Sequence, residues 1–189
     1  MKVIQLHQEE KQLIMLAVEN NRQAQQQIYV KFSSKMLSVC RQYIKDIHHA
    51  EDVMITGFMK VFTNLKNFEH KGSFEGWIRR IMVYECIDFL RVKKNNFNHQ
   101  DIEDVTISEN ESVYEMEDFS VDDIQNMIDN LPDGYKMVFN LYAIEGYKHQ
   151  EIAEMLKISE GTSKSQLSHA RKLLQQQITE LKKKLNGTK

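Results

Sequence analysis

Short polar and cationic side chains recur on one face of a helix that the sequence predicts after Ser159. At about 100° per residue, the inner face of this helix holds Ser163, Leu167, Ala170 and Leu174. The opposite face, an arc of roughly 160°, carries Lys164, Ser165, Ser168, His169, Arg171 and Lys172. Solvated helix surfaces usually mix acids with bases, yet no acid occurs between Glu160 and Glu180.

Such a face suits the major groove of duplex DNA. Short donors flanked by cations reach base edges, a role we assign to Lys164, Ser165, Ser168 and His169. We expect phosphates to be held by Arg171, Lys172 and the backbone amides near Thr162. The alternative is a helical hairpin whose basic face has no DNA partner.

The residues before this face complete a helix-turn-helix. Residues 149–156 predict a short helix with Ile152 inward, residues 157–159 form the turn, and Ser159 is a favourable N-cap. Two further helices are predicted from 121 to 130 and from about 132 to Gly146. The sequence therefore predicts a DNA-binding C-terminal body.

A second pattern runs through residues 71–94, where Ser73 is a plausible N-cap. A helix here places one mostly apolar stripe at Ile78, Met82, Cys86, Phe89 and Leu90. A separate line carries Trp77, Arg80, Tyr84, Asp88 and Arg91. Aromatic rings interleaved with cations are typical of surfaces that bind unstacked bases and a single-stranded backbone. On this pattern alone, a core role for the stripe is equally open.

The histidine pair His48-His49 stands next to two acids, Glu51 and Asp52. A metal site could be drawn there, but no second cluster at ligand spacing accompanies it. We therefore interpret the segment as a helix start whose acids lie at the positive end of the helix dipole.

Charge is divided unevenly along the chain. Residues 1–99 hold 15 basic and 10 acidic side chains, and residues 131–189 hold 10 basic and 6 acidic ones. Between them, residues 100–130 hold 11 acidic side chains and no basic one. The net charge of −2 therefore hides two basic bodies. The acidic connector lacks helical periodicity. It is either a solvated tether or a mimic of a nucleic-acid backbone that occupies a basic channel of a partner.

Composition sets the fold class. One proline, seven glycines and the lack of alternating strands predict an all-α protein. We expect two small helical domains, 10–96 and 120–182, joined by a flexible acidic linker, 97–119.

Cys40 and Cys86 lie in apolar patterns and are expected to be buried. No apolar run of about 18 residues occurs and no signal peptide is evident, which predicts a cytoplasmic protein.

The order of helical body, acidic linker and helix-turn-helix resembles a known family. With the segments AEDVMITGFMKVF, GSFEGWIRRIM and GYKHQEIAEMLKISEGTSKSQLSHARKLL, the chain looks like an RNA polymerase sigma factor of the extracytoplasmic-function (ECF) group, sigma-70 family, over about residues 22–178. The resemblance implies that the first domain is sigma-two-like, binds the β′ clamp of core polymerase and opens the −10 promoter element. It implies that the second is sigma-four-like, binds the β flap and reads the −35 element.

Residue roles follow from the same resemblance. The surface that opens the −10 element is expected to comprise Lys71, Ser73, Phe74, Trp77, Arg80, Tyr84 and Arg91. Within it, the loop 71–74 is the expected pocket for a flipped-out base. Core polymerase binding is expected at Asp52, Ile55, Thr56 and Phe58.

Four positions depart from the family pattern. Ile55-Thr56 replaces the usual Gln-Glu, so only Asp52 and Phe58 carry over directly to polymerase binding. Tyr84 stands where an asparagine is usual, and a phenol can stack but lacks an amide's paired donor and acceptor. His169 replaces an arginine, which removes a permanently charged fork suited to guanine.

Partners and alternatives complete the prediction. The resemblance implies promoter DNA, core RNA polymerase and an anti-sigma factor, often membrane-anchored, as partners of a chain that is monomeric when free. A stand-alone helix-turn-helix regulator with a helical dimerisation domain is the main alternative. No phosphate loop, nucleophile motif or metal-ligand spacing occurs, so we expect no enzymatic activity, no cofactor and no metal.

Overall fold

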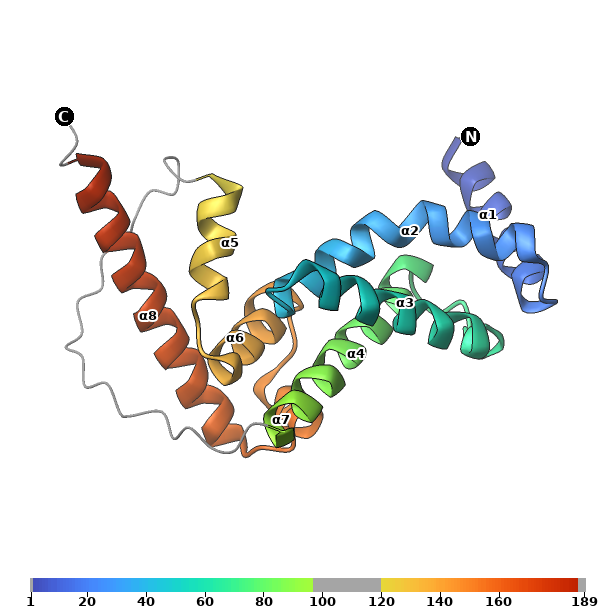
Figure 1. Ribbon diagram of the computed structural model, residues 1–189. Coiled ribbons are helices and arrows are strands. Elements are labelled where there is room, and N and C mark those ends of the chain that lie inside the picture. The colour runs from blue at the N-terminus through green and yellow to red at the C-terminus, as the bar shows by residue number, and fades with distance from the viewer. Residues whose placement is uncertain (1, 97–119, 187–189) are drawn as a thin grey trace. The chain divides into compact units, whose positions relative to one another are not determined.

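The computed structural model describes residues 2–96 and 120–186 of the chain. Every regular element in these ranges is a helix, which confirms the predicted all-α fold. The chain divides into two compact units, an N-terminal unit of residues 1–92 and a C-terminal unit of residues 93–189 (Figure 1). The predicted acidic linker, 97–119, lies outside the described residues.

Four α-helices begin in the N-terminal unit. They are α1 (Lys2–Val18), α2 (Arg22–Tyr43), α3 (Ile47–Asn64) and α4 (Phe74–Asn96), and a 3₁₀ turn, Leu65–Asn67, follows α3. Side chains fix two of the helix starts. Asn21 Oδ1 accepts a hydrogen bond from the Ala24 amide at 3.1 Å, and Asp46 Oδ1 accepts one from the His49 amide at 3.0 Å. The bond from His49 lowers the pKa of Asp46.

The core of this unit lies between α2, α3 and α4. Its fully buried side chains include Ile28, Cys40, Val61, Ile78, Met82 and Cys86. The two cysteines are buried and free, as predicted. The apolar stripe of α4 therefore faces the core, which leaves the Trp77 line on the other side of the helix.

Gly57 of α3 lies against the side chain of Met82 in α4. A Cβ at this position would lie 2.3 Å from Sδ of Met82, which is fully buried. Alanine would gain about 1 kcal/mol of helix propensity but force the core to shift, at a cost of about 1–3 kcal/mol. We expect Gly57→Ala to lower the free energy of unfolding of the N-terminal unit by up to about 2 kcal/mol.

Urea denaturation followed by the fluorescence of Trp77, the chain's one tryptophan, measures this change. Thr56→Ala, at the exposed neighbouring position, is the matched control and should not lower the midpoint. A Gly57→Ala midpoint above that of the wild type would contradict the expected clash, because the gain in helix propensity would then be unopposed.

The C-terminal unit contains α5 (Val121–Asp129), α6 (Asp133–Phe139), α7 (His149–Leu156) and α8 (Glu160–Asn186). A capping box begins α5: the Asp123 amide donates to Ser120 Oγ and the Ser120 amide donates to Asp123 Oδ2, both at 3.1 Å. Hydrogen bonds from Ser120 lower the pKa of Asp123. A π-helical turn, Asn140–Ile144, extends α6, and Gly146 ends it with φ of 77°.

The helices α5, α6 and α7 pack along α8, as Figure 1 shows. Val138, Leu141, Ile152, Leu167 and Ala170 form the centre of their common core. Two charged side chains also lie inside: Asp129 at the end of α5 and Lys136 in α6, with side chains 1% and 5% exposed and 3.9 Å between Oδ1 and Nζ. The hydrophobic pattern does not predict this buried pair.

Candidate nucleic-acid interface

The helix-turn-helix has the bounds that the sequence predicts. Helix α7 spans His149–Leu156, and Lys157 turns the chain with a left-handed φ of 56°. Ser159 caps α8, because its Oγ accepts a hydrogen bond from the Thr162 amide at 2.9 Å. This cap fixes the residue at which α8 begins.

The two faces of α8 separate largely as expected, although Leu174, predicted for the inner face, is half-buried. Ser163, Leu167 and Ala170 are buried against the rest of the unit. Lys164, Ser165, Ser168 and Arg171 are exposed, whereas Thr162, His169 and Lys172 are half-buried. All seven predicted duplex-binding residues therefore have surface on α8, and their roles remain predictions.

Two of these residues interact within their own helix. Lys164 Nζ lies 2.6 Å from Glu160 Oε1, and Ser165 Oγ donates to the Thr162 carbonyl at 3.0 Å. The hydrogen bond from Lys164 lowers the pKa of Glu160. Both pairs are exposed, so the side chains can exchange these contacts for phosphate or base contacts at low cost.

Two tyrosines outside α8 contact its polar face. The Tyr135 ring stacks on His169, with centroids 5.4 Å apart and an interplanar angle of 14°. The Arg171 guanidinium lies 5.8 Å from the centroid of Tyr142, whose ring also stacks on His149 at 4.6 Å. His149 Nδ1 in turn lies 2.9 Å from Ser163 Oγ. The contacts of the two tyrosines with α8 were not predicted from the sequence. The available signal was their seven-residue spacing, which places both rings on one face of a predicted helix.

In the N-terminal unit, Ser73 caps α4 as predicted, since its Oγ accepts a hydrogen bond from the Gly76 amide at 3.0 Å. The Trp77 ring is half-buried. Its centroid lies 5.5 Å from the ring centroid of Phe68 and 5.9 Å from that of Phe74. Farther along α4, the Arg80 guanidinium lies 5.9 Å from the centroid of Tyr84. Arg91 Nη1 forms an ion pair with Asp88 at 2.9 Å.

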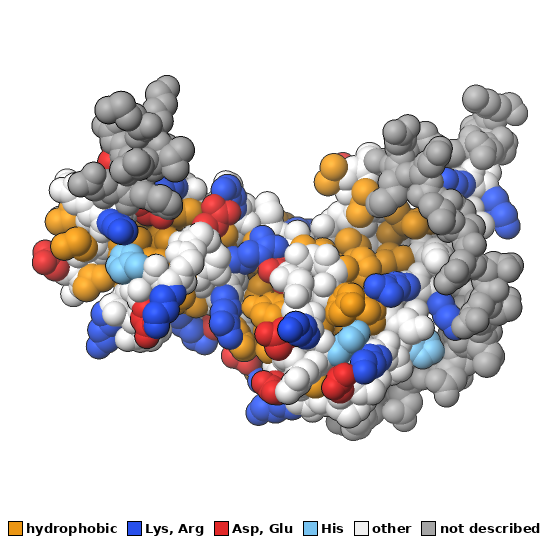
Figure 2. All heavy atoms as spheres, turned by 180° about the vertical axis from the view of Figure 1, so that it is seen from behind, with side chains coloured by type: hydrophobic (Ala, Val, Ile, Leu, Met, Phe, Trp, Pro, Cys, Tyr) orange, Lys and Arg blue, Asp and Glu red, His pale blue; other side chains and the backbone are white. Residues whose placement is uncertain are grey.

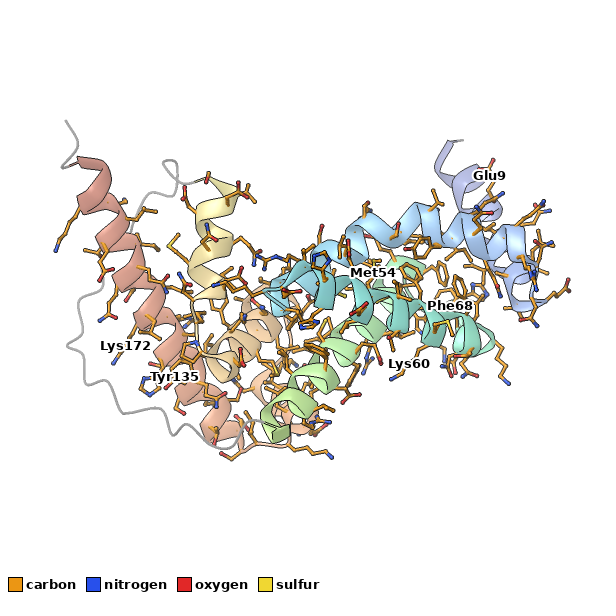
Figure 3. The ribbon with its side chains drawn as sticks, viewed as in Figure 1. Glu9, Met54, Lys60, Phe68, Tyr135 and Lys172 are labelled. Carbon is orange, nitrogen blue, oxygen red and sulfur yellow. The ribbon has the colours of Figure 1, made fainter. Side chains whose placement is uncertain are left out.

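An open groove of about 330 Å³ lies beside this line. Its walls are Lys60, Asn64, Asn67, Trp77, Ile81, Tyr84 and Glu85. Glu85 is buried and accepts a hydrogen bond from Lys60 at 2.5 Å, which holds the lysine over the groove. Lys60, labelled in Figure 3, reaches from α3 toward Glu85 of α4. The groove thus offers two aromatic faces, amides, and a lysine that is paired with a carboxylate.

Two predicted site residues lie in the core instead. Phe74 is 2% exposed and packs against Phe32 and Phe68 at 5.7 and 5.1 Å, so its ring does not line a pocket in the loop 71–74. Phe58 is also 2% exposed and contacts Tyr29 at 4.9 Å. Both rings are held by residues of α2, far away in the sequence. They can support a binding surface only from beneath it.

The other residues predicted for polymerase binding lie on the surface of α3. Asp52 and Thr56 are exposed, and Thr56 Oγ1 donates to the Asp52 carbonyl at 2.9 Å. Ile55 is 51% exposed, and Met59, which was not predicted as a site residue, is 65% exposed. Hydrophobic side chains reach the surface in both units (Figure 2).

The remaining predicted positions lie near the ends of helices. Lys71 is exposed and pairs with Glu69 at 2.7 Å, beside Gly72, whose φ is 95°. His48 Nδ1 lies 3.8 Å from Glu51 Oε2. Among the described residues, no group of three His, Cys, Asp or Glu side chains could hold a metal ion.

Comparison with known proteins matches both units. The family model of sigma-70 region 2 matches residues 28–96, and that of sigma-70 region 4 matches residues 121–174. The ECF RNA polymerase sigma factor SigW of Bacillus subtilis is 29% identical over 163 residues, covering 79% of this chain and 86% of that protein. The sigma factor SigV of the same organism is 29% identical over 137 residues, covering 72% and 80%.

Two solved structures share the fold. The sigma factor RpoE from Bartonella quintana, in complex with the anti-sigma factor NepR, has a TM-score of 0.53 at 19% identity and covers 82% of this chain and 96% of its own. CnrH, in complex with the cytosolic domain of CnrY, has a TM-score of 0.50 at 18% identity and covers 90% and 97%.

The two matched regions define a transcription initiation factor that acts on promoter DNA together with RNA polymerase. The chain belongs to the sigma-70 family and, within it, to the ECF sigma factors. It directs core RNA polymerase to promoters, which confirms the predicted function.

Proposed function

We propose that the α8 face of the C-terminal unit reads the −35 element of the promoter. Lys164, Ser165, Ser168 and His169 contact base edges, while Arg171, Lys172 and the amides near Thr162 hold phosphates. The observation that carries this proposal is the clean division of α8, with three buried small or apolar residues on one side and the polar set exposed or half-buried on the other.

For the −10 element, we propose that the groove beside Trp77 and Tyr84 receives unstacked bases. Ring faces stack with any base, and Lys60 and Arg80 supply cations for the backbone. Lys71, Ser73 and Arg91 flank this surface. Phe74 acts by packing under Trp77, at 5.9 Å between ring centroids.

Core polymerase binds, in this proposal, to the exposed surface of α3 formed by Asp52, Ile55, Thr56 and Met59, with Phe58 beneath it. Exposed aliphatic side chains ringed by polar groups are typical of protein interfaces. The segment 10–96 thus contacts the polymerase β′ clamp and the −10 element, 120–182 contacts the β flap and the −35 element, and 97–119 joins them.

An anti-sigma factor is the proposed regulatory partner, since two structures that share this fold are complexes with such proteins or with the cytosolic domain of a partner chain. No described helix is long and apolar enough to cross a membrane. We propose a cytoplasmic chain, monomeric when free, with no cofactor and no catalytic activity of its own.

The test is in vitro transcription with core polymerase on promoters that carry a randomised −35 element. We expect Ser165→Ala and His169→Ala to change which −35 sequences are used, by roughly 5- to 150-fold at the affected base pairs. Lys164→Ala should either change the −35 preference in the same way or lower transcription evenly from all promoters. Glu180→Gln, about 16 to 24 Å farther along α8 than the three substituted residues, is the matched control and should leave the preferred sequence unchanged.

Unchanged −35 preferences in all three variants would reject the assigned reading face. Failure of the purified chain to associate with core polymerase, together with tight binding to a palindromic duplex, would favour the stand-alone regulator instead.

A further inference from the structure

Tyr135 covers one side of His169, although the two residues belong to different helices. Tyr135 lies in α6, His169 lies in α8, and their rings stack almost in parallel, 5.4 Å between centroids and 14° between planes. Figure 3 shows Tyr135 against the stretch of α8 that also carries Lys172. The aromatic contact therefore reaches the proposed reading face from outside the recognition helix.

The Tyr135 ring does not belong to the core of the unit. It is half-buried, whereas Lys136 and Val138, which belong to the same helix, are buried. Gly134 also faces α8, where an added Cβ would meet only the Gln166 side chain at 3.4 Å. The ring thus lies over the surface of α8, and its aromatic contact there is the one to His169.

Stacking limits how the imidazole can turn. The second side-chain torsion of histidine is broad on an open helix surface, and a parallel aromatic neighbour favours one ring plane. The ring nitrogens lie on the imidazole's edge, and a hydrogen bond weakens steeply when its angle departs from linear. Fixing the plane therefore fixes which base edge an imidazole nitrogen can meet.

We propose that Tyr135 is a positioning residue for −35 recognition. It holds the His169 ring in the orientation that meets a base edge, so the base preference of this sigma factor depends on a residue outside α8. The inference rests on the proposed reading role of His169.

Tyr142 provides the matched comparison within the same unit. Its ring lies 5.8 Å from the guanidinium of Arg171, which we assign to a phosphate rather than to a base. Loss of this ring should weaken binding about evenly across −35 sequences, whereas loss of the Tyr135 ring should change the sequence preference.

The experiment measures −35 preference by in vitro transcription with core polymerase and a promoter library of fixed −10 element. The variants are Tyr135→Phe, Tyr135→Leu, His169→Ala, the double variant Tyr135→Leu with His169→Ala, and Tyr142→Leu. We expect Tyr135→Phe to keep the wild-type preference. Tyr135→Leu should lose about fivefold or more at the base pairs that His169→Ala affects, and the double variant should match His169→Ala alone.

Wild-type preference in Tyr135→Leu, while His169→Ala changes it, would overturn the inference and leave the proposed function standing. No change in His169→Ala would reject the reading role of His169 and the inference with it. Loss of preference in Tyr135→Phe would also overturn the inference, because the hydroxyl rather than the stacked ring would then be responsible.

A folding defect in Tyr135→Leu, detected by circular dichroism, does not end the test. The ring protons of His169 should show an upfield ring-current shift in the NMR spectrum of the wild type and of Tyr135→Phe. Absence of that shift would overturn the inference without any leucine variant.

Discussion

Replacing Lys136 by methionine is expected to lower the free energy of unfolding of the C-terminal unit by about 3–5 kcal/mol, because it leaves a buried carboxylate without its cation. The side chains of Lys136 and Asp129 are 5% and 1% exposed, and Nζ lies 3.9 Å from Oδ1. Asp129 also ends α5, where the helix dipole disfavours a negative charge. The positive charge of Lys136 therefore offsets two costs for Asp129, the burial of its carboxylate and the unfavourable interaction with the helix dipole.

Urea denaturation followed by two signals isolates this effect. Trp77, the one tryptophan, reports the N-terminal unit, whereas circular dichroism reports the helices of both units. In Lys136→Met, a fraction of the helical signal should be lost at lower urea while the Trp77 transition stays in place.

Two further variants separate the buried charge from the loss of a lysine as such. Lys148→Met removes an exposed lysine of the same unit and should change the free energy of unfolding little. Adding Asp129→Asn to Lys136→Met also removes the buried negative charge and should restore much of the lost stability. If Lys136→Met stayed within about 1 kcal/mol of the wild type, the pair would contribute no more than an exposed one.

Tyr84→Ala is expected to weaken binding of the unpaired −10 strand by roughly 5- to 150-fold, the equivalent of about 1–3 kcal/mol for one stacked base. Tyr84 is 37% exposed at the edge of the groove, and Arg80 lies 5.9 Å from its ring centroid. Its removal takes away an aromatic face and the surface that holds Arg80.

The measurement is the affinity of the polymerase–sigma complex for a fluorescent single-stranded −10 oligonucleotide. Tyr84→Phe keeps the ring and should bind within about twofold of the wild type, since stacking needs no hydroxyl. Trp77 fluorescence in a urea titration checks that the unit stays folded. Binding of Tyr84→Ala at wild-type strength would show that bases do not stack at this groove.

The helix-turn-helix could be predicted from the sequence because its signals are local. The two faces of α8 follow from a fixed rotation per residue, and the start of α8 follows from a cap within three residues of Ser159. The Ser73 cap at the start of α4 is local in the same way. The fold class and the bounds of α7 needed no knowledge of the packing.

The positions of single aromatic rings could not be predicted in this way. Phe58 and Phe74 stand in helical patterns as compatible with a surface as with a core, and rings of α2, Tyr29 and Phe32, place both in the core. Tyr84 stands in the same kind of pattern yet stays exposed. The difference depends on which helix lies opposite, and periodicity does not encode that.

The sequence by itself therefore determined the all-α class, the bounds of the helix-turn-helix, the Ser73 and Ser159 caps, and the set of residues that share the polar face of α8. Tertiary structure alone decided that Lys136 is buried with Asp129, that the walls of the groove come from α3 and α4 together, and that Tyr135 stacks on His169. The physical reason is the distance along the chain between the residues that interact. Caps and helix faces depend on neighbours within a few residues, whereas burial and stacking depend on side chains that only the packing of separate helices brings together.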